Sequence, residues 1–388
     1  MSEQLVRHGP LAGGPRPPRT AAGPALRLAG LLAALYGFLL SVSLMEAGFD
    51  AFGAGFSKAL ISATANPFVA LVAGVLATSI VQSSSCTTSI IVSMVASGTL
   101  TVSNAVPMVM GANIGTTVTN TLVSLGCMSR KEEFRRAFAA ATVHDFFNLL
   151  TTAILLPVEL ATGYLQRTAV YLTGHLAGVS AGSAWGSPLK PLFRPVVALA
   201  KSAVSSLPAV PAGVVLVVLA GGMLFACLFA MMRLLRGAAA GKTQAALDRI
   251  IGSAPALGLL AGALLTAVVQ SSSIVTSMLV PLVAAGILQL EQAFAITLGA
   301  NIGTTVTAIL ASLAVGPQGL TIALVHLLFN VTGVALFFPV RPVRRVPIWL
   351  ARRLADLAAR SRGYALAYTI TVFYGIPGLL VLLWRLLR

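Results

Sequence analysis

Long apolar segments divide this chain, and they constrain its fold more than any other feature. Their approximate positions are 27–48, 67–98, 103–126, 137–157, 211–232, 255–286, 291–313, 320–340 and 364–384. Only 9% of the residues are charged, whereas a soluble domain carries about 25%. Because the bilayer core offers no water to unpaired backbone groups, these segments predict an all-α polytopic membrane protein. The composition excludes soluble enzymes, nucleic-acid-binding proteins and disordered proteins.

The basic residues, which give a net charge of +16, are concentrated between the apolar segments. They form three clusters, at 130–136, 233–249 and 341–362, which we expect to be loops. By the positive-inside rule, these clusters and the N-terminus lie in the cytoplasm. The positive charge therefore indicates membrane orientation and not nucleic-acid binding. All three cysteines lie in apolar segments, so no disulfide framework is implied.

The chain contains an internal repeat. The sequence Gln-Ser-Ser-Ser occurs at 82–85 and again at 270–273. The nine-residue sequence Gly-Ala-Asn-Ile-Gly-Thr-Thr-Val-Thr occurs at 111–119 and again at 299–307. Both pairs are separated by the same 188 residues (82 to 270, and 111 to 299). An identity of this length at a fixed offset indicates a duplicated structural unit.

A third pair of motifs supports the duplication. His-Asp-Phe-Phe-Asn at 144–148 matches His-Leu-Leu-Phe-Asn at 326–330. The first Gln-Ser-Ser-Ser segment follows one crossing from a cytoplasmic N-terminus, whereas the second follows the basic cluster at 233–249. The two halves therefore enter the membrane from opposite faces. Inverted repeats with interrupted helices are typical of secondary transporters, which bind their substrate where the repeats meet.

Each Gln-Ser-Ser-Ser segment interrupts an apolar stretch, 67–98 or 255–286, so each arm reaches only part of the way across a bilayer. We expect two re-entrant helical hairpins with polar tips. Amide and hydroxyl groups, together with the free N–H groups of the following helix, favour an anion. Serines that only form hydrogen bonds between helices are the alternative. The predicted anion-binding residues are Gln82, Ser83, Ser84, Ser85, Gln270, Ser271, Ser272 and Ser273.

The repeated Gly-Ala-Asn-Ile-Gly-Thr-Thr segments predict a second kind of ligand. Two closely spaced glycines favour local unwinding of a membrane helix, and the freed carbonyls with Asn and Thr oxygens are suitable ligands for sodium. Close helix packing through the small residues is the alternative, which we consider the weaker explanation on its own. The candidate sodium ligands in these segments and in the third motif are Asn113, Thr116, Thr119, Asp145, Asn148, Asn301, Thr304 and Thr307. For Asn148, hydrogen bonding between helices is the alternative.

The distribution of charge around these motifs narrows the ligand. No Lys or Arg occurs in 59–129 or in 250–340. A multivalent anion at the tips would meet no cationic side chain there, so bound Na⁺ or H⁺ would have to balance its charge. Asp145 is the one carboxylate within the repeated motifs, and Leu327 is its counterpart. Because a carboxylate in the membrane core is functional by default, one further cation site is expected on that side. A structural, hydrogen-bonded Asp145 is the alternative. We interpret Glu159, near a predicted interface, as solvated.

These motifs closely resemble those of the type II sodium-dependent phosphate cotransporter family, over about 60–375. The resemblance implies sodium-driven uptake of divalent phosphate, an inverted-repeat fold and elevator-type movement. It assigns the two tips to the phosphate and sodium site, which adds Gln270 and Ser271 to the expected sodium ligands, and it assigns Thr304 and Thr307 to sodium. In that family, Asp at the position of Asp145 goes with an additional sodium ion and electrogenic transport. The 158–210 stretch lacks the cysteine pair and glycosylation sequon of animal members, which indicates a prokaryotic member.

The expected organisation is a disordered basic tail (1–26), a first inverted repeat (27–160), an extracytoplasmic linker (161–210), a second inverted repeat (211–340), a basic cytoplasmic segment (341–363) and a C-terminal transmembrane helix (364–388). The expected location is the plasma (inner) membrane. The expected partners are phosphate, sodium and the bilayer, without a cofactor or enzyme activity. Another oxyanion, a carboxylate substrate or an anion channel are the alternatives. A serine hydrolase would need a general base, which the duplicated tip does not offer.

Overall fold

The structure is a computed structural model, and it describes residues 24–125, 130–176, 190–250 and 255–386. This described part contains helices and their connections, which confirms the all-α class. The helices are α1 (Pro24–Ala51), α2 (Gly53–Ala63), α3 (Pro67–Val81), α4 (Ser84–Ala96), α5 (Val102–Gly115), α6 (Val118–Leu125), α7 (Lys131–Thr162), α8 (Tyr164–Leu176), α9 (Lys190–Ala203), α10 (Ala209–Ile250), α11 (Pro255–Val269), α12 (Ser272–Ala284), α13 (Leu290–Val315), α14 (Pro317–Phe337), α15 (Arg341–Arg360), α16 (Arg362–Ile370), the π-helix η1 (Thr371–Gly375) and α17 (Ile376–Leu386).

Among the described residues, six helical stretches are long and apolar enough to cross a membrane. They are Ala25–Ala51, Lys131–Thr162, Ala209–Met231, Leu290–Val315, Pro317–Phe337 and Arg362–Leu383. A seventh is obtained if α2 and α3, which meet at a bend of 103°, are counted as one broken or re-entrant span. These stretches confirm a multi-pass membrane protein with six or seven candidate spans.

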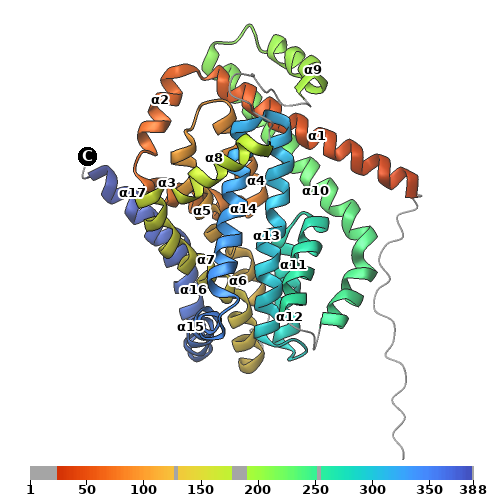
Figure 1. Cartoon of the computed structure of the whole chain (residues 1–388), viewed down its shortest axis with the longest axis vertical. Coiled ribbons are helices and arrows are strands. Elements are labelled where there is room, and N and C mark those ends of the chain that lie inside the picture. Colours follow the sequence, from red (N-terminus) through yellow and green to blue (C-terminus); the bar gives the residue numbers. More distant parts are fainter. Residues whose placement is uncertain (1–23, 126–129, 177–189, 251–254, 387–388) are drawn as a thin grey trace, which may run out of the picture.

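The helices α13 and α14 run through the middle of the molecule (Figure 1). On one side, α1 packs along α10, and the C-terminal helices α16 and α17 lie on the opposite side (Figure 1). Phe147 of α7 is fully buried, and its ring forms edge-on contacts with Phe294 of α13 and Phe337 of α14. Helices α7, α13 and α14, which carry copies of the duplicated motifs, therefore pack against one another.

Both Gln-Ser-Ser-Ser segments interrupt a helix, as expected. In the first repeat α3 has 15 residues and α4 has 13, and the second repeat has the same lengths in α11 and α12. At about 1.5 Å per residue each arm is roughly 20 Å long, shorter than the ~30 Å hydrocarbon core of a bilayer. The two interrupted pairs are thus matched in length and in the position of the break.

The glycines of the second repeated motif serve close helix packing. A Cβ atom at Gly111 would lie 1.9 Å from a backbone oxygen of α3, and one at Gly299 would lie 1.8 Å from a backbone oxygen of α11. The first copy is interrupted at Thr116 and Thr117, but α13 is continuous through its copy. The expected unwinding is therefore wrong for the second copy, because its small residues bring α13 against α11 while its backbone bonds stay intact.

Two other expectations need correction, the loops and the length of the N-terminal tail. The three basic clusters are largely helical, since α7 begins at Lys131, α10 continues through 233–249 to Ile250, and 341–362 lies in α15 and the start of α16. The linker at 161–210 contains α8 and α9, and its residues 177–189 lie outside the described part. Residues 1–23 of the expected disordered tail also lie outside the described part, whereas Pro24–Ala51 is already helical.

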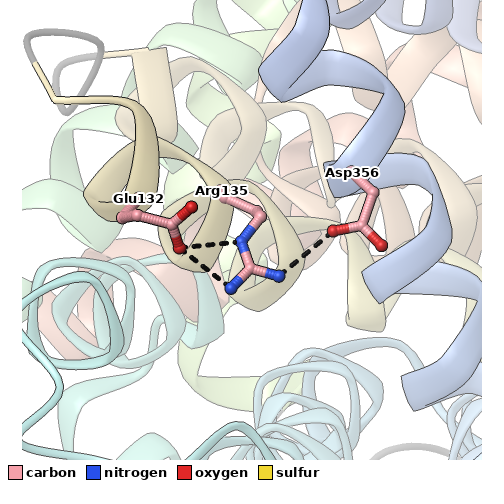
Figure 2. A network of polar contacts seen from close by, with 3 residues as sticks. All are labelled: Glu132, Arg135 and Asp356. Carbon is pink, nitrogen blue, oxygen red and sulfur yellow. Dashed lines mark hydrogen bonds and ion pairs between the residues drawn. The ribbon is translucent and has the colours of Figure 1, made fainter.

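The third basic cluster forms α15, which is seen nearly along its axis at one end of the molecule (Figure 1). Arg135 of α7 forms ion pairs with Asp356 of α15 at 3.2 Å and with Glu132 at 2.9 Å (Figure 2). Arg352 of α15 pairs with Glu291 of α13 at 2.8 Å. These pairs are exposed and contribute at most about 1 kcal/mol each, so they orient α15 more than they stabilise it.

Candidate functional site

The two Gln-Ser-Ser-Ser segments have nearly the same backbone conformation. Gln82 and Gln270 have φ values of 57° and 56°, and among the described residues they alone adopt a positive φ without being glycine. Ser83 (φ −148°, ψ 104°) and Ser271 (φ −154°, ψ 106°) are extended and come directly before α4 and α12. Left-handed backbone costs about 1–2 kcal/mol for a residue with a Cβ. Equal strain at matching positions indicates that both tips have a shared role.

Each tip glutamine is bound to a threonine of its own repeat. Thr119 Oγ1 donates a hydrogen bond to Gln82 Oε1 at 2.7 Å, and Thr307 Oγ1 donates to Gln270 Oε1 at 2.7 Å. Each glutamine Nε2 also donates to a backbone oxygen in the last turn of its preceding helix. Both ends of each amide are therefore engaged, and they hold the tip against the helix that carries the second repeated motif.

The hydrogen-bond donors at the tips are backbone N–H groups in the first turns of α4 and α12. The leading N–H groups of a helix have no partner within that helix, and its dipole favours negative charge there. Ser83 Oγ accepts a hydrogen bond from Cys86 N at 3.3 Å, whereas Ser271 forms no such side-chain cap. Ser84 and Ser272 are buried, with 5% and 3% of their surface exposed. Two buried, hydroxyl-rich helix starts are suited chemically to an oxyanion.

Contacts between the halves bring the two tips toward the opposite repeat. Ser85 Oγ of the first tip lies 3.4 Å from Thr307 Oγ1 of the second repeat. From the second hairpin, Thr276 Oγ1 and Ser277 Oγ donate to Asn120 Oδ1 of the first repeat, each at 3.0 Å. The sequence predicted that the tips would be near one another's repeat, but it did not identify Asn120 or its two partners.

A buried polar network joins the repeats at a second level. His144 Nε2 lies 2.6 Å from Asn301 Oδ1. Asn301 Nδ2 in turn donates to Asn148 Oδ1 at 3.0 Å, and Asn148 Nδ2 donates to the backbone oxygen of Asn113 at 2.8 Å. All four residues are at most 5% exposed. Asn148, a predicted sodium ligand, therefore has both ends of its amide engaged with other residues.

The other half of this network pairs the corresponding residues, but the asparagine of the third motif is the donor there instead of the acceptor. His326 Nε2 lies 3.2 Å from Asn113 Oδ1, and Asn330 Nδ2 donates to the same oxygen at 3.3 Å. Each repeat thus extends its His-x-x-x-Asn motif to the Asn of the other repeat's Gly-Ala-Asn motif. Sequence reasoning did not predict the role of either histidine, although the shared spacing within the third motif pair was a signal for it.

Asp145 lies fully buried on α7. Its Oδ2 accepts a hydrogen bond from the Tyr368 hydroxyl at 3.0 Å, whereas its Oδ1 accepts none from the described residues. Within that part of the chain, no hydrogen bond joins Asp145 to either tip. The Thr117 hydroxyl, which donates to the backbone oxygen of Ile114, also lies beside this carboxylate. The carboxylate therefore has one oxygen available for a cation. Tyr368 was not among the residues that the sequence indicated.

Two further predicted ligands, Thr116 and Thr304, form matching hydrogen bonds within their own helices. Thr116 Oγ1 donates to the backbone oxygen of Ala112 and Thr304 Oγ1 to that of Ala300, both at 2.9 Å. These bonds use the hydroxyl protons and leave oxygen lone pairs for a cation. The structure thus contains two groups of contacts, one between the tips and Thr119 or Thr307 and one among the histidines and asparagines. Which of these oxygens bind sodium stays a prediction.

Glu159 corrects one interpretation. It is only 8% exposed, and its carboxylate accepts hydrogen bonds from Leu165 N at 2.6 Å and Gln166 N at 3.2 Å. It therefore binds the start of α8 and is not solvated. The helix dipole favours an acidic side chain at the N-terminus of a helix. The position of Glu159 near a predicted interface did not indicate this role.

These features define a class: a helical, multi-pass membrane protein with a duplicated core in which two interrupted helices face each other's repeats. The comparison with protein families identifies the class more closely. The model of the Na⁺/Pi-cotransporter family matches residues 38–170 and 223–350. The chain belongs to this family, as its motifs predicted.

The relatives found agree with this assignment. The chain is 35% identical to the sodium-dependent phosphate transport protein 2B of Homo sapiens, with 93% of the chain and 66% of that protein aligned. It is 33% identical to the sodium-dependent phosphate transport protein 2A of Ovis aries, with 95% of the chain and 70% of that protein aligned. The chain thus spans about two thirds of the length of these relatives. No solved structure was found to match the chain.

Proposed function

We propose that this chain is a sodium-coupled secondary active transporter that imports inorganic phosphate across the plasma membrane. The family and the names of its relatives supply the substrate and the coupling ion. The observation that carries the proposal is the matched pair of strained tips, Gln82 and Gln270, each bound to a threonine. Two such tips form a pseudo-symmetric pair, which is what a single substrate site between inverted repeats needs.

The charge balance explains why transport is coupled to sodium. No lysine or arginine occurs in 59–129 or 250–340, so hydroxyls and helix dipoles alone would face a phosphate dianion. Two sodium ions at the Asn and Thr oxygens of the repeated motifs would neutralise it. A third ion at Asp145 would make transport electrogenic, because one net positive charge would then enter with each phosphate. The predicted ligands near the tips are Asn113, Thr116, Thr119, Gln270, Ser271, Asn301, Thr304 and Thr307.

The membrane arrangement that we propose is an inverted repeat with a cytoplasmic N-terminus. The helix pairs α3–α4 and α11–α12 are the re-entrant hairpins, and repeats 27–160 and 211–340 enclose the site. In support, α3 and α4 lie toward the end of the molecule where α2 is found, whereas α11 and α12 lie toward the end where α15 is found (Figure 1). The basic clusters at 130–136 and 341–362 meet at that second end through Arg135 and Asp356. Elevator-type movement of the hairpins would alternate access to the site.

Uptake of radiolabelled phosphate into proteoliposomes tests the proposal. We expect uptake with an inward Na⁺ gradient and none with an equal K⁺ gradient. Excess unlabelled sulfate is expected to leave uptake unchanged, and inhibition by sulfate would indicate a broader oxyanion carrier. Phosphate flux that follows its own gradient without sodium would indicate a channel and contradict the proposal.

The serines of the tips provide the test at residue level. Ser83→Ala and Ser271→Ala each remove a hydroxyl that a bound anion would use, and a hydrogen bond to a charged group contributes about 1.5–3 kcal/mol. We expect both variants to need at least tenfold more phosphate for half-maximal uptake. Ser205→Ala, an exposed serine after α9, is the matched control and should behave as the wild type. Wild-type affinity in both tip variants would refute the shared site.

A further inference from the structure

The C-terminal span carries a tyrosine that is fixed against the Asp145 carboxylate. The Tyr368 ring lies among three aromatic rings, with centroids 6.4 Å from Phe138, 6.3 Å from Phe146 and 6.2 Å from Phe373. Two of these rings come from α7, the helix that also carries Asp145. Because the ring is held from several sides, its hydroxyl is directed at Asp145 Oδ2 at 3.0 Å without loss of further side-chain freedom.

This hydrogen bond orients the carboxylate and distinguishes its two oxygens. Tyr368 binds Oδ2, while Oδ1 has no hydrogen-bond partner among the described residues although Asp145 is fully buried. A buried carboxylate oxygen without a partner is costly, and a cation would relieve that cost. A partner that binds a ligand's far oxygen holds it in the orientation for ion binding, as outer hydrogen bonds do in metal sites. The hydroxyl is thus placed to present Oδ1 to an ion.

The span that supplies this tyrosine has an unusual helix geometry. Its middle turn, η1, is a π-helix, and such turns occur frequently at functional sites. Within η1, the Tyr374 hydroxyl donates to the backbone oxygen of Ser79 at 3.2 Å. Ser79 lies in the last turn of α3, and the same oxygen accepts from Gln82 Nε2. One span therefore contacts both the Asp145 carboxylate and the base of the first tip.

These contacts make the first repeat differ from the second. The α16–α17 span follows both repeats and is not part of the duplication, and the counterpart of Asp145 is Leu327. We propose that Tyr368 is a positioning residue that holds Asp145 so that Oδ1 binds one coupling cation. The aromatic span thereby contributes to an ion site of the first repeat that has no counterpart in the second. This inference rests on the proposed function, which supplies sodium as the cation.

The test compares Tyr368→Phe with Tyr364→Phe, an exposed tyrosine on the same helix. Tyr368→Phe keeps the ring and removes only the hydroxyl. We expect it to raise the Na⁺ concentration for half-maximal phosphate uptake about tenfold, as loss of an outer hydrogen bond does in metal sites. The Tyr364→Phe protein should match the wild type. Unchanged sodium dependence in Tyr368→Phe would overturn the inference.

The Asp145→Gly protein distinguishes a positioning role of Tyr368 from a general effect of its substitution on the fold. In the Asp145→Gly protein there is no carboxylate to orient, so adding Tyr368→Phe should change neither the sodium dependence nor the charge moved per phosphate. If the double variant loses a further tenfold, Tyr368 acts through the fold and the inference is wrong. Reduced charge per phosphate in Tyr368→Phe alone would support it.

A readout without transport keeps the inference distinct from the proposed function. Binding to the folded state raises the thermal unfolding midpoint of the purified protein, so Na⁺ should raise it relative to K⁺. We expect this sodium-dependent increment to be smaller in Tyr368→Phe than in wild type and Tyr364→Phe. This comparison remains valid even if the variant is less stable overall, because each protein's midpoint in Na⁺ is compared with its own midpoint in K⁺. If wild type shows no phosphate uptake but the increment is smaller in Tyr368→Phe, the proposed substrate is wrong while the role of Tyr368 stands. Equal increments in all three proteins would refute that role.

Discussion

Gln82 and Gln270 occupy a left-handed backbone conformation that usually belongs to glycine. The side chain explains why glutamine stands there. Its Oε1 accepts from Thr119 or Thr307, and its Nε2 donates to the preceding turn, so one residue ends a helix and binds the next motif. Two hydrogen bonds of about 1 kcal/mol each offset a backbone strain of about 1–2 kcal/mol. Strain and side-chain contacts are thus coupled within a single residue.

Two substitutions at Gln270 separate these contributions. Gln270→Ala keeps the backbone strain and loses the hydrogen bonds, whereas Gln270→Gly loses both. We expect Gln270→Gly to be more stable than Gln270→Ala by about 1 kcal/mol. Both should lose most sodium-dependent phosphate uptake, because neither holds Thr307. Thermal unfolding in detergent, together with uptake by the same preparations, measures both effects. A Gly variant less stable than the Ala variant would contradict the strain argument.

At the scale of elements, the interrupted helices could be predicted and the continuous one could not. Gln-Ser-Ser-Ser is polar and lies within an apolar run, so it marks the breaks at 82–83 and 270–271. The glycines of the second motif have two possible explanations, unwinding or close packing, and sequence alone does not separate them. The structure decides for packing at Gly299, because α11 approaches to a distance that no Cβ would allow.

The packing argument predicts the cost of a single methyl group. Gly299→Ala would place a Cβ 1.8 Å from the backbone oxygen of Leu259, so α11 and α13 would have to separate. We expect a loss of about 1–3 kcal/mol, the usual cost of overpacking. Gly222→Ala, on α10, is the matched control: its new methyl group would have no neighbouring atom within 4 Å, so the change should be neutral or slightly stabilising. Thermal unfolding of both variants gives the comparison, and equal midpoints would refute close packing at Gly299.

The polar network between the repeats consists of contacts that could not be predicted from the sequence. The pairs His144–Asn301 and His326–Asn113 link motifs that are far apart in the chain. The spacing within each motif could be read from the sequence, but the exchange between repeats depends on how the halves pack. For the same reason Tyr368 could not be found from the repeat, since it lies on a span outside it. What could be predicted was local or duplicated, and what was missed arises from tertiary contacts of unique elements.

At the scale of the whole molecule, the arginine-rich segments and the short helix α2 lie toward opposite ends. The α7 start and α15, both rich in arginine, meet through Arg135 and Asp356 at one end (Figure 2). The short helix α2 lies toward the opposite end (Figure 1). If the arginine-rich end is cytoplasmic, α3 enters from outside, and the α11 hairpin enters from inside. This opposition is the physical basis of the proposed inverted repeat.

Cysteine labelling tests this orientation in the complete protein. In a background with Cys86, Cys127 and Cys227 replaced by serine, Gly55→Cys introduces a thiol on α2, at an exposed position with open space around it. Arg345→Cys introduces one on the exposed face of α15. We expect a membrane-impermeant maleimide to label Gly55→Cys in intact cells, because α2 follows one crossing from a cytoplasmic N-terminus. Arg345→Cys should be labelled only after permeabilisation, and phosphate uptake by both variants shows that they are folded. Labelling of both positions from the same side would exclude the inverted arrangement, and labelling of Arg345→Cys alone in intact cells would reverse the proposed orientation.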